Sequence, residues 1–158
     1  MTPSEPRTPE AEPHEGDGWT PIHDTGFIAH VGPVYVRDGA YAFRAADKHA
    51  NLIGVVHGGM LMSFADRALG ETAMWAADGA NCVTIQMEMQ FVDTARLGDW
   101  ITLAPEVIKR TGSLVFLRCE LRHAARVVGV ASGVWKILRR RPEAPPVPGP
   151  SGALSEGA

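Results

Sequence analysis

Cysteine is scarce in this sequence: its 158 residues include only Cys82 and Cys119. Two widely spaced thiols form neither the disulfide framework of a small secreted domain nor a cysteine zinc site. The N-terminus also lacks the basic and apolar segments of a secretion signal. These absences favour a protein of the reducing cytoplasm.

Long hydrophobic runs and an excess of positive charge are missing as well. No apolar run approaches the roughly 20 residues of a membrane helix, so we expect no membrane partner. The net charge of −3 provides no basic face for a nucleic acid. No His, Cys and Asp residues have the spacing of a metal site, and the sequence implies neither a metal nor another cofactor.

Proline is not scarce, but most of it lies near the two ends. Four of the 12 prolines fall in residues 1–13 and five in residues 142–150. Both ends also lack apolar periodicity, and such segments bury too little surface to offset the entropy lost on ordering. We therefore predict disordered tails at 1–18 and 141–158 and one folded domain at 19–140.

One segment of this domain, residues 58–77, is rich in Ala, Met and Leu and contains no Pro. This composition favours a helix, and apolar residues nearly all around it indicate that the helix is buried. Residues 84–91 then alternate between polar and apolar side chains, which predicts a half-buried strand. Two other strands are predicted before the helix, at 26–36 and 41–46, and three after residue 91, at 99–110, 114–123 and 126–138. The breaks between the strands after the helix are short enough for consecutive strands to be antiparallel neighbours. The fold class is α+β, an antiparallel sheet wrapped around one long central helix.

The start of the predicted helix carries the first chemical signal, His57-Gly58-Gly59. Glycines at this position leave the first backbone N–H groups of the helix open to a ligand. The helix dipole makes the same end attractive to negative charge. Such a site can act as an oxyanion hole for a carbonyl group under attack.

Asp66 is the second signal, because a carboxylate is unusual inside an apolar helix. The side chains about one turn away from it are those of Met62, Ser63, Leu69 and Gly70. None of them is cationic, so burial of the Asp66 carboxylate implies that a cavity, water or a functional demand holds it there. Glu71 differs, since Arg67 lies four residues before it and can form a solvated ion pair with it.

The spacing of the two signals constrains the site. Gly58 and Asp66 are eight residues apart, or about 12 Å along a helix that rises ~1.5 Å per residue. One carbonyl group cannot contact both groups of the same helix. If both act on one carbonyl, they belong to two subunits whose helices run antiparallel, and the site lies at the twofold interface of a homodimer.

The spacing of these residues also resembles that of a known family. Asn51 is followed six residues later by His57-Gly58-Gly59, Asp66 lies nine residues after His57, and a strand begins near Thr84. This pattern resembles the PaaI-like branch of the hotdog-fold thioesterase superfamily. The resemblance implies the hotdog fold, acyl-CoA hydrolysis and a homodimer with shared active sites that often pairs into a homotetramer.

The resemblance also implies roles for individual residues. The amide of Gly58 would donate to the thioester oxygen, while Asn51 and His57 would shape the loop before the helix, with Asn51 near the carbonyl or the water. Asp66 would act either as nucleophile or as general base on water. Thr84 matches a strand position near the attacking water.

The remaining candidates concern substrate binding. Gly59, Met62 and Ser63 are predicted to contact the substrate. Arg110 is a candidate for the CoA phosphates, although residues 110–113 depart from the Gly-Arg order usual in the family. Residues 139–141, which are all Arg, are a second choice for that role. His49 is interpreted as a surface residue.

The predicted substrate is an aryl-acyl-CoA or a short-to-medium-chain acyl-CoA, and an acyl carrier protein in place of CoA stays open. A hotdog hydratase or dehydratase is a second enzyme hypothesis, but it requires a His paired with an acid in a motif that the sequence lacks. A non-catalytic acyl-CoA binding module is a third hypothesis. Asp66 argues against it, because a pure binder gains nothing from a buried acid.

Overall fold

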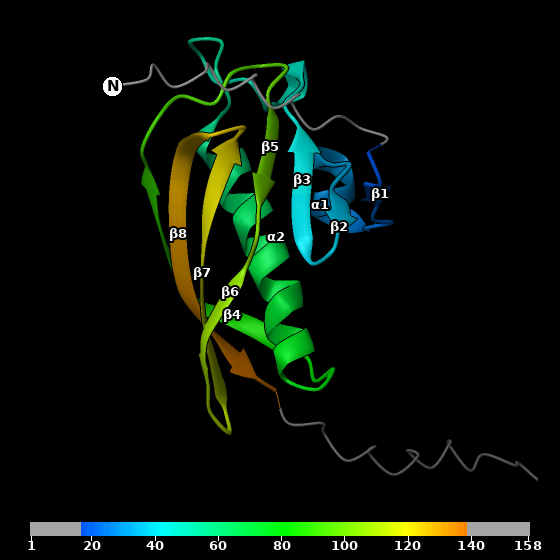
Figure 1. The fold of residues 1–158 in the computed structure, drawn as a ribbon, viewed down its shortest axis with the longest axis vertical. Helices are drawn as coiled ribbons and strands as arrows, with labels where there is room; N and C mark the ends of the chain where they lie inside the picture. The colour runs from blue at the N-terminus through cyan, green and yellow to red at the C-terminus, as the bar shows by residue number, and fades with distance from the viewer. Residues whose placement is uncertain (1–16, 139–158) are drawn as a thin grey trace, which may run out of the picture.

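A 19-residue helix, α2 (Gly58–Ala76), lies across one face of an antiparallel sheet (Figure 1). The computed structural model describes residues 17–138, so residues 1–16 of the first predicted tail, residues 139 and 140, and the whole second tail at 141–158 lie outside the described residues. The remaining elements are β1 (Thr20–Pro21), α1 (Gly26–Val31), β2 (Tyr35–Arg37), β3 (Ala40–Arg44), the 3-10 helix η1 (Asp47–His49), β4 (Cys82–Phe91), β5 (Trp100–Leu103), β6 (Glu106–Arg110), β7 (Leu114–His123) and β8 (Arg126–Ile137). No helix within 17–138 is long and apolar enough to cross a membrane.

The strands follow the order β1-β2-β3-β5-β7-β8-β4, and β6 pairs with β7. Every pairing is antiparallel. The predicted α+β class, a sheet wrapped around one long helix, is therefore confirmed. The expectation that β4 and β5 are neighbours was wrong, because β4 pairs with β8 while β5 pairs with β3 and β7. Residues 92–99 carry the chain from the edge strand β4 past β8 and β7 to β5 in the middle of the sheet.

Two predicted strands are also corrected. Residues 26–36 contain the helix α1 and the strand β2, separated by the Gly32-Pro33 pair. The apolar residues Ile28 and Val31 lie three positions apart, which is helical spacing, and both pack against the core. The segment 99–110 divides into β5 and β6 at Ala104-Pro105, where proline has no N–H for the sheet ladder.

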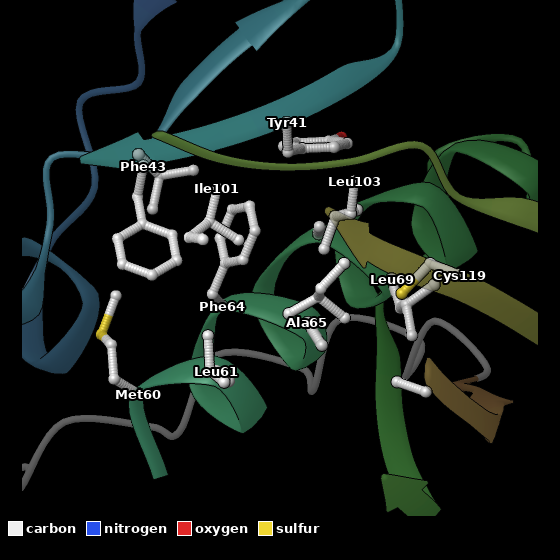
Figure 2. Close-up of a cluster of buried hydrophobic side chains, with 14 of the residues drawn as sticks. Tyr41, Phe43, Met60, Leu61, Phe64, Ala65, Leu69, Ile101, Leu103 and Cys119 are labelled. Carbon is white, nitrogen blue, oxygen red and sulfur yellow. The ribbon is translucent and has the colours of Figure 1, made fainter. Parts of the chain in front are cut away.

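The core lies between α2 and the sheet (Figure 2). Phe64 of α2 packs edge-on against Phe43 of β3, with ring centroids 4.8 Å apart. The buried residues of α2 are Met60, Leu61, Phe64, Ala65, Ala68, Leu69 and Ala73. The helix is thus buried on one side only, and the expectation of burial all around was wrong. Met62, Met74 and Trp75 are exposed in the single chain.

The strand β4 has one neighbour, β8, among the described residues, and its other edge is free. We expected its apolar side chains to be buried on one face. Ile85 and Phe91 are instead 55% and 54% exposed, and a register shift between Thr84 and Gln86 interrupts the alternation at Ile85. A single chain therefore leaves an unpaired strand edge that carries exposed apolar side chains.

Candidate active site

His57 forms the N-cap of α2, and its imidazole Nδ1 accepts the N–H of Gly59 at 2.8 Å. A Cβ on Gly59 would lie 2.9 Å from this same Nδ1, so the cap requires a glycine there. The expected loop-ordering role of His57 agrees with this geometry. The amide of Gly59, however, is already bonded, which corrects the expectation that both glycines leave their N–H groups open.

The N–H of Gly58 has no hydrogen-bond partner within residues 17–138. It belongs to the first residue of α2, where the positive end of the helix dipole favours negative charge. The ring of Phe91 covers this glycine, and a Cβ at position 58 would lie only 3.0 Å from Phe91 Cζ. The backbone at Gly58 therefore has a donor available for a carbonyl oxygen beside an aromatic ring.

Asn51 shapes the loop that leads to this donor. Its Oδ1 accepts the N–H groups of Ile53 at 3.0 Å and Val55 at 3.2 Å. Its own backbone N–H donates to the carbonyl of Val55 at 2.8 Å. The side-chain oxygen of Asn51 is thus occupied by its own turn, and the geometry fits the loop-shaping role.

His49 is a functional candidate that sequence reasoning missed, since we interpreted it as a surface residue. Its exposed fraction is 4%, and among residues 17–138 it is the one polar or charged residue that is buried. Its Nδ1 accepts the N–H of Ala46 at 3.0 Å, so its Nε2 carries the proton and donates to the carbonyl of Val31 at 2.6 Å. Burial lowers the pKa of His49 from 6.5. The backbone carbonyl of His49 accepts the N–H of His57 at 2.7 Å and so supports the cap of α2.

Asp66 lies on α2 beside the strand β4. Its Oδ1 accepts a hydrogen bond from the hydroxyl of Thr84 at 2.7 Å, so the fold brings these two predicted residues together. The side chain is half-buried rather than buried, because one side of α2 is uncovered in the single chain.

Two predicted substrate-binding residues lie on the same side of α2. Met62 is exposed about one turn before Asp66. Ser63 Oγ donates to the carbonyl of Gly59 at 2.7 Å, so its hydroxyl proton is committed to the helix backbone. Both residues therefore lie on the half of α2 that also carries Asp66.

Arg67 points to a different side of the helix and connects α2 to the segment before α1. The predicted pair with Glu71 is confirmed, with 2.7 Å between Arg67 Nη1 and Glu71 Oε2. Arg67 Nε also bonds Asp24 Oδ1 at 2.8 Å, and less than a fifth of either of these two side chains is exposed. The Glu71 side chain is 44% exposed, as expected for a solvated partner, whereas the additional pair with Asp24 is largely buried.

Arg110 lies away from the start of α2. Its guanidinium forms an ion pair with Asp78 at 2.8 Å, just after the helix ends. Figure 1 shows the β6–β7 hairpin near this end of α2, opposite the end at which the helix begins. Within one chain, Arg110 is therefore not brought together with Gly58.

The chain thus carries two candidate half-sites, one at the start of α2 and one where α2 meets β4. The first is the free amide of Gly58, and the second is the Asp66–Thr84 pair. Eight residues of helix separate them, which is about 12 Å at ~1.5 Å per residue. A single thioester carbonyl, about 1.2 Å long, cannot contact both half-sites of one chain.

Comparison with known proteins identifies the family. The model of a family described as the thioesterase superfamily matches residues 53–130. PA0474 of Pseudomonas aeruginosa, an esterase by provisional assignment, is 30% identical over 128 residues, covering 77% of this chain and 96% of that protein. This chain belongs to the thioesterase superfamily. The matched residues include both half-sites, and the prediction of a thioesterase is confirmed at the level of the superfamily.

Two further similarities are informative. Human acyl-coenzyme A thioesterase 13 is 27% identical over 90 residues, which cover 57% of this chain but only 64% of that protein. The structure of the E. coli PaaI protein, from the phenylacetic acid degradation operon, superposes with a TM-score of 0.57 at 18% identity and covers 63% of this chain and 72% of that one. The predicted resemblance to hotdog-fold thioesterases, PaaI among them, is therefore confirmed for the fold.

Proposed function

We propose that this protein hydrolyses an acyl-CoA thioester to the free acid and CoA at sites shared between two copies of the chain. The observation that carries the proposal is the separation of the Gly58 amide from Asp66 along the helix α2, with Thr84 of β4 bonded to Asp66. Two antiparallel copies of α2 would place the Gly58 of one copy opposite the Asp66 of the other, and twofold symmetry would create two such sites.

In each site the thioester oxygen accepts the N–H of Gly58, and the helix dipole stabilises the negative charge that develops on it. With Asp66 as general base, the carboxylate takes a proton from water while the water oxygen bonds to the carbonyl carbon. The C–S bond then breaks, and the CoA sulfur leaves as a thiolate that takes up a proton. With Asp66 as nucleophile, its oxygen bonds to the carbonyl carbon, the C–S bond breaks, and the CoA thiolate leaves and takes up a proton. Water then cleaves the resulting mixed anhydride, which releases the free acid and regenerates the Asp66 carboxylate. Both routes consume one water, and the Thr84 hydroxyl orients Asp66 in both.

The free edge of β4 and the exposed side of α2 support the dimer. An unpaired strand edge with exposed apolar side chains, here Ile85 and Phe91, is a surface that soluble proteins normally cover. Pairing of β4 with a second β4 would extend the sheet through both chains and bring the two copies of α2 close together. Pairing of such dimers into a homotetramer is the higher state that we propose.

The proposed substrate is an aryl-acyl-CoA or a short-to-medium-chain acyl-CoA. The name of the human relative specifies acyl-coenzyme A thioesters, and the E. coli structure comes from an operon for an arylacetic acid. Arg110 is proposed for the CoA phosphates, which would require a polyanion strong enough to displace Asp78. The free thiols Cys82 and Cys119 fit the proposed cytoplasmic location.

The test is release of free thiol from a panel of aryl and aliphatic acyl-CoAs by the wild type, Asp66→Asn and Asp66→Ala. We expect turnover to fall by about 100-fold or more in both variants, with unchanged oligomeric state. Full activity in the variants would refute the role of Asp66. Tight binding without turnover by the wild type would instead identify an acyl-CoA binding module. Activity confined to acyl carrier protein thioesters would correct the substrate.

A further inference from the structure

The strand β4 changes face partway along its length. Met87 and Met89 both pack against the core, which sets the two-residue period of the strand. Continued toward the N-terminus, this period places Ile85 on the inner face and Thr84 on the outer face. The structure has the opposite arrangement, because the Thr84 hydroxyl reaches Asp66 of α2 while Ile85 is exposed. An irregularity in the strand therefore reverses which side chain faces the helix.

The irregularity is a β-bulge. Thr84 pairs with Trp135, and Gln86 pairs with Val134, the residue just before Trp135 on β8. Ile85 is thus an extra residue with no partner on β8. In a regular ladder Ile85 would pair with Trp135, and Thr84 would point to the other face, since a one-residue slip reverses the face of every shifted side chain. The first residues of β4 thus have two possible registers on β8, and only the bulged register forms the second half-site.

The bulged register is not the one that apolar burial favours. Isoleucine gains more from burial than threonine does, yet Ile85 is 55% exposed. Within a single chain the regular register would bury Ile85 and expose Thr84. Conflicts of this kind between local pattern and structure are typical of functional positions. A contact elsewhere in the fold must therefore hold the bulge in place.

Trp135 lies opposite the bulge and is 1% exposed. Its ring extends from β8 to α2, since a Cβ on Gly133 of β8 would lie 2.9 Å from Cη2 and a Cβ on Gly70 of α2 would lie 3.5 Å from Nε1. Gly70 follows Asp66 by one turn of the helix. The indole therefore fills the space between sheet and helix beside Asp66. The place across from it on β4 accommodates the short side chain of Thr84 better than a longer one.

We propose that Trp135 is a positioning residue for the hydrolysis. Its ring keeps Ile85 off the inner face, holds β4 in the bulged register and so presents the Thr84 hydroxyl to Asp66. The inference rests on the proposed function for the use of that hydroxyl, whereas the register can be measured without turnover. Bulges also keep free strand edges from pairing with other chains, but a bulge with that role alone would not depend on Trp135.

The native thiol of Cys82 reports the register. Cys82 pairs with Ile137 in the bulged register, and a regular ladder would place it opposite Leu138. Ile137→Cys and Leu138→Cys therefore each offer Cys82 a partner in one register only, at a separation suited to a disulfide. Oxidation followed by peptide mapping measures the crosslinked fraction in each variant and distinguishes this disulfide from any that involves Cys119.

We expect Ile137→Cys to form the disulfide readily and Leu138→Cys to form little. With Trp135→Leu added, the ratio of the two crosslinked fractions should shift toward Leu138→Cys by about tenfold or more, because burial of Ile85 then favours the regular register. Trp135→Phe keeps a ring in the same place and should keep the wild-type ratio. Trp100→Leu is the matched control, because Trp100 is also 1% exposed but lies on β5, which does not pair with β4. If Trp135→Leu does not fold, Trp135→Met removes the ring with a smaller loss of volume.

A second hydroxyl tests whether the register serves the reaction. Trp135→Leu should lower kcat by about tenfold, because Thr84 leaves Asp66. Adding Ile85→Thr to Trp135→Leu places a threonine on the inner face in either register, so it should restore most of the lost kcat. Ile85→Thr alone is measured as the reference. A tryptophan that only fills the core would not be replaced by a threonine on another strand.

Several results would overturn the proposal. These are a ready disulfide of Leu138→Cys in the presence of Trp135, an unchanged ratio in Trp135→Leu, or an equal shift in Trp100→Leu. A shifted register without recovery of kcat by Ile85→Thr would leave protection of the strand edge as the role of the bulge. If the wild type hydrolyses no acyl-CoA while the disulfide follows Trp135, the proposed function alone fails. Hydrolysis by the wild type with a disulfide that ignores Trp135 refutes this inference alone.

Discussion

The hydroxyl of Thr84 donates a 2.7 Å hydrogen bond to Oδ1 of Asp66, which joins the edge strand β4 to the helix α2. Residues 18 positions apart thus form one half-site. An ionised carboxylate has no proton to donate, so the direction of this bond is set by the hydroxyl group. The bond holds one carboxylate oxygen and leaves the other available for a water molecule or a carbonyl carbon.

Replacement of Thr84 tests this arrangement. Thr84→Val keeps the shape of the side chain but removes the donor, and we expect kcat to fall by about tenfold because Asp66 loses its orientation. Thr84→Ser keeps the hydroxyl and should retain most of the activity. Steady-state kinetics on the preferred acyl-CoA would measure both. Equal loss in the serine and valine variants would show that packing of the methyl group, and not the hydrogen bond, is what matters.

The amide of Gly58 can be tested by removing its hydrogen. Gly58 is the first residue of α2, a position where proline is tolerated, and His57 before it has the extended backbone that proline requires. Gly58→Pro should lower kcat/KM by about 100-fold, the usual loss for an oxyanion-hole donor. Gly58→Ala introduces a similar contact with Phe91 but keeps the N–H, so it should be much less impaired. Similar losses in both variants would mean that the Phe91 contact, and not the amide, limits the reaction.

Sharing of the site between chains predicts complementation. Asp66→Asn and Gly58→Pro are each expected to be nearly inactive. If equal amounts of the two variants are refolded together, random pairing makes about half of the dimers heterodimers. Each heterodimer has one site with both groups intact, so the mixture should recover about a quarter of the wild-type activity. The mixed species can be isolated with two different affinity tags. If both groups acted within one chain, every site in the mixture would carry a lesion and no activity would return.

His49 predicts a dependence of stability on pH. Burial lowers the pKa of His49 below 6.5 in the folded chain, so below that pH the unfolded chain binds a proton that the folded chain excludes. The contribution of His49 to the free energy of unfolding is fully present above pH 6.5. It decreases as the pH falls toward the pKa of His49 in the folded chain, by at most about 1.4 kcal/mol per pH unit. Lys48 disfavours the protonated form as well.

Urea unfolding of the wild type and His49→Gln between about pH 7.5 and 5 measures this effect as a difference. Glutamine keeps a donor for Val31 but does not titrate. The free energy of unfolding of the wild type should therefore fall more steeply with decreasing pH than that of the variant. Parallel curves would show that His49 does not exclude a proton when the chain is folded.

The central helix and the chemistry of its start could be predicted from local sequence. Residues 58–76 have helical composition, and the glycine pair marks the first turn, where free amides depend only on local hydrogen bonding. The distance between Gly58 and Asp66 follows from helix geometry alone. The prediction that two chains share each site therefore needed no tertiary structure.

Contacts between distant segments could not be predicted in the same way. His49 follows Asp47 and Lys48 in a three-residue 3-10 helix, which is too short to have a periodicity that would indicate burial of its ring against Val31. The helical spacing in 26–31 was present, but six residues are too few to distinguish a helix from a strand by pattern.

The sequence by itself thus determined the long helix and the separation of Gly58 from Asp66, the two groups proposed to react, because each depends on residues within a few turns of one another. Only the tertiary structure decided that β4 is an edge strand paired with β8 and that Thr84 contacts Asp66. Strand order and side-chain contacts depend on which segments exclude water together across the whole chain. The spacing of residues within one segment does not show which other segments it will pack against.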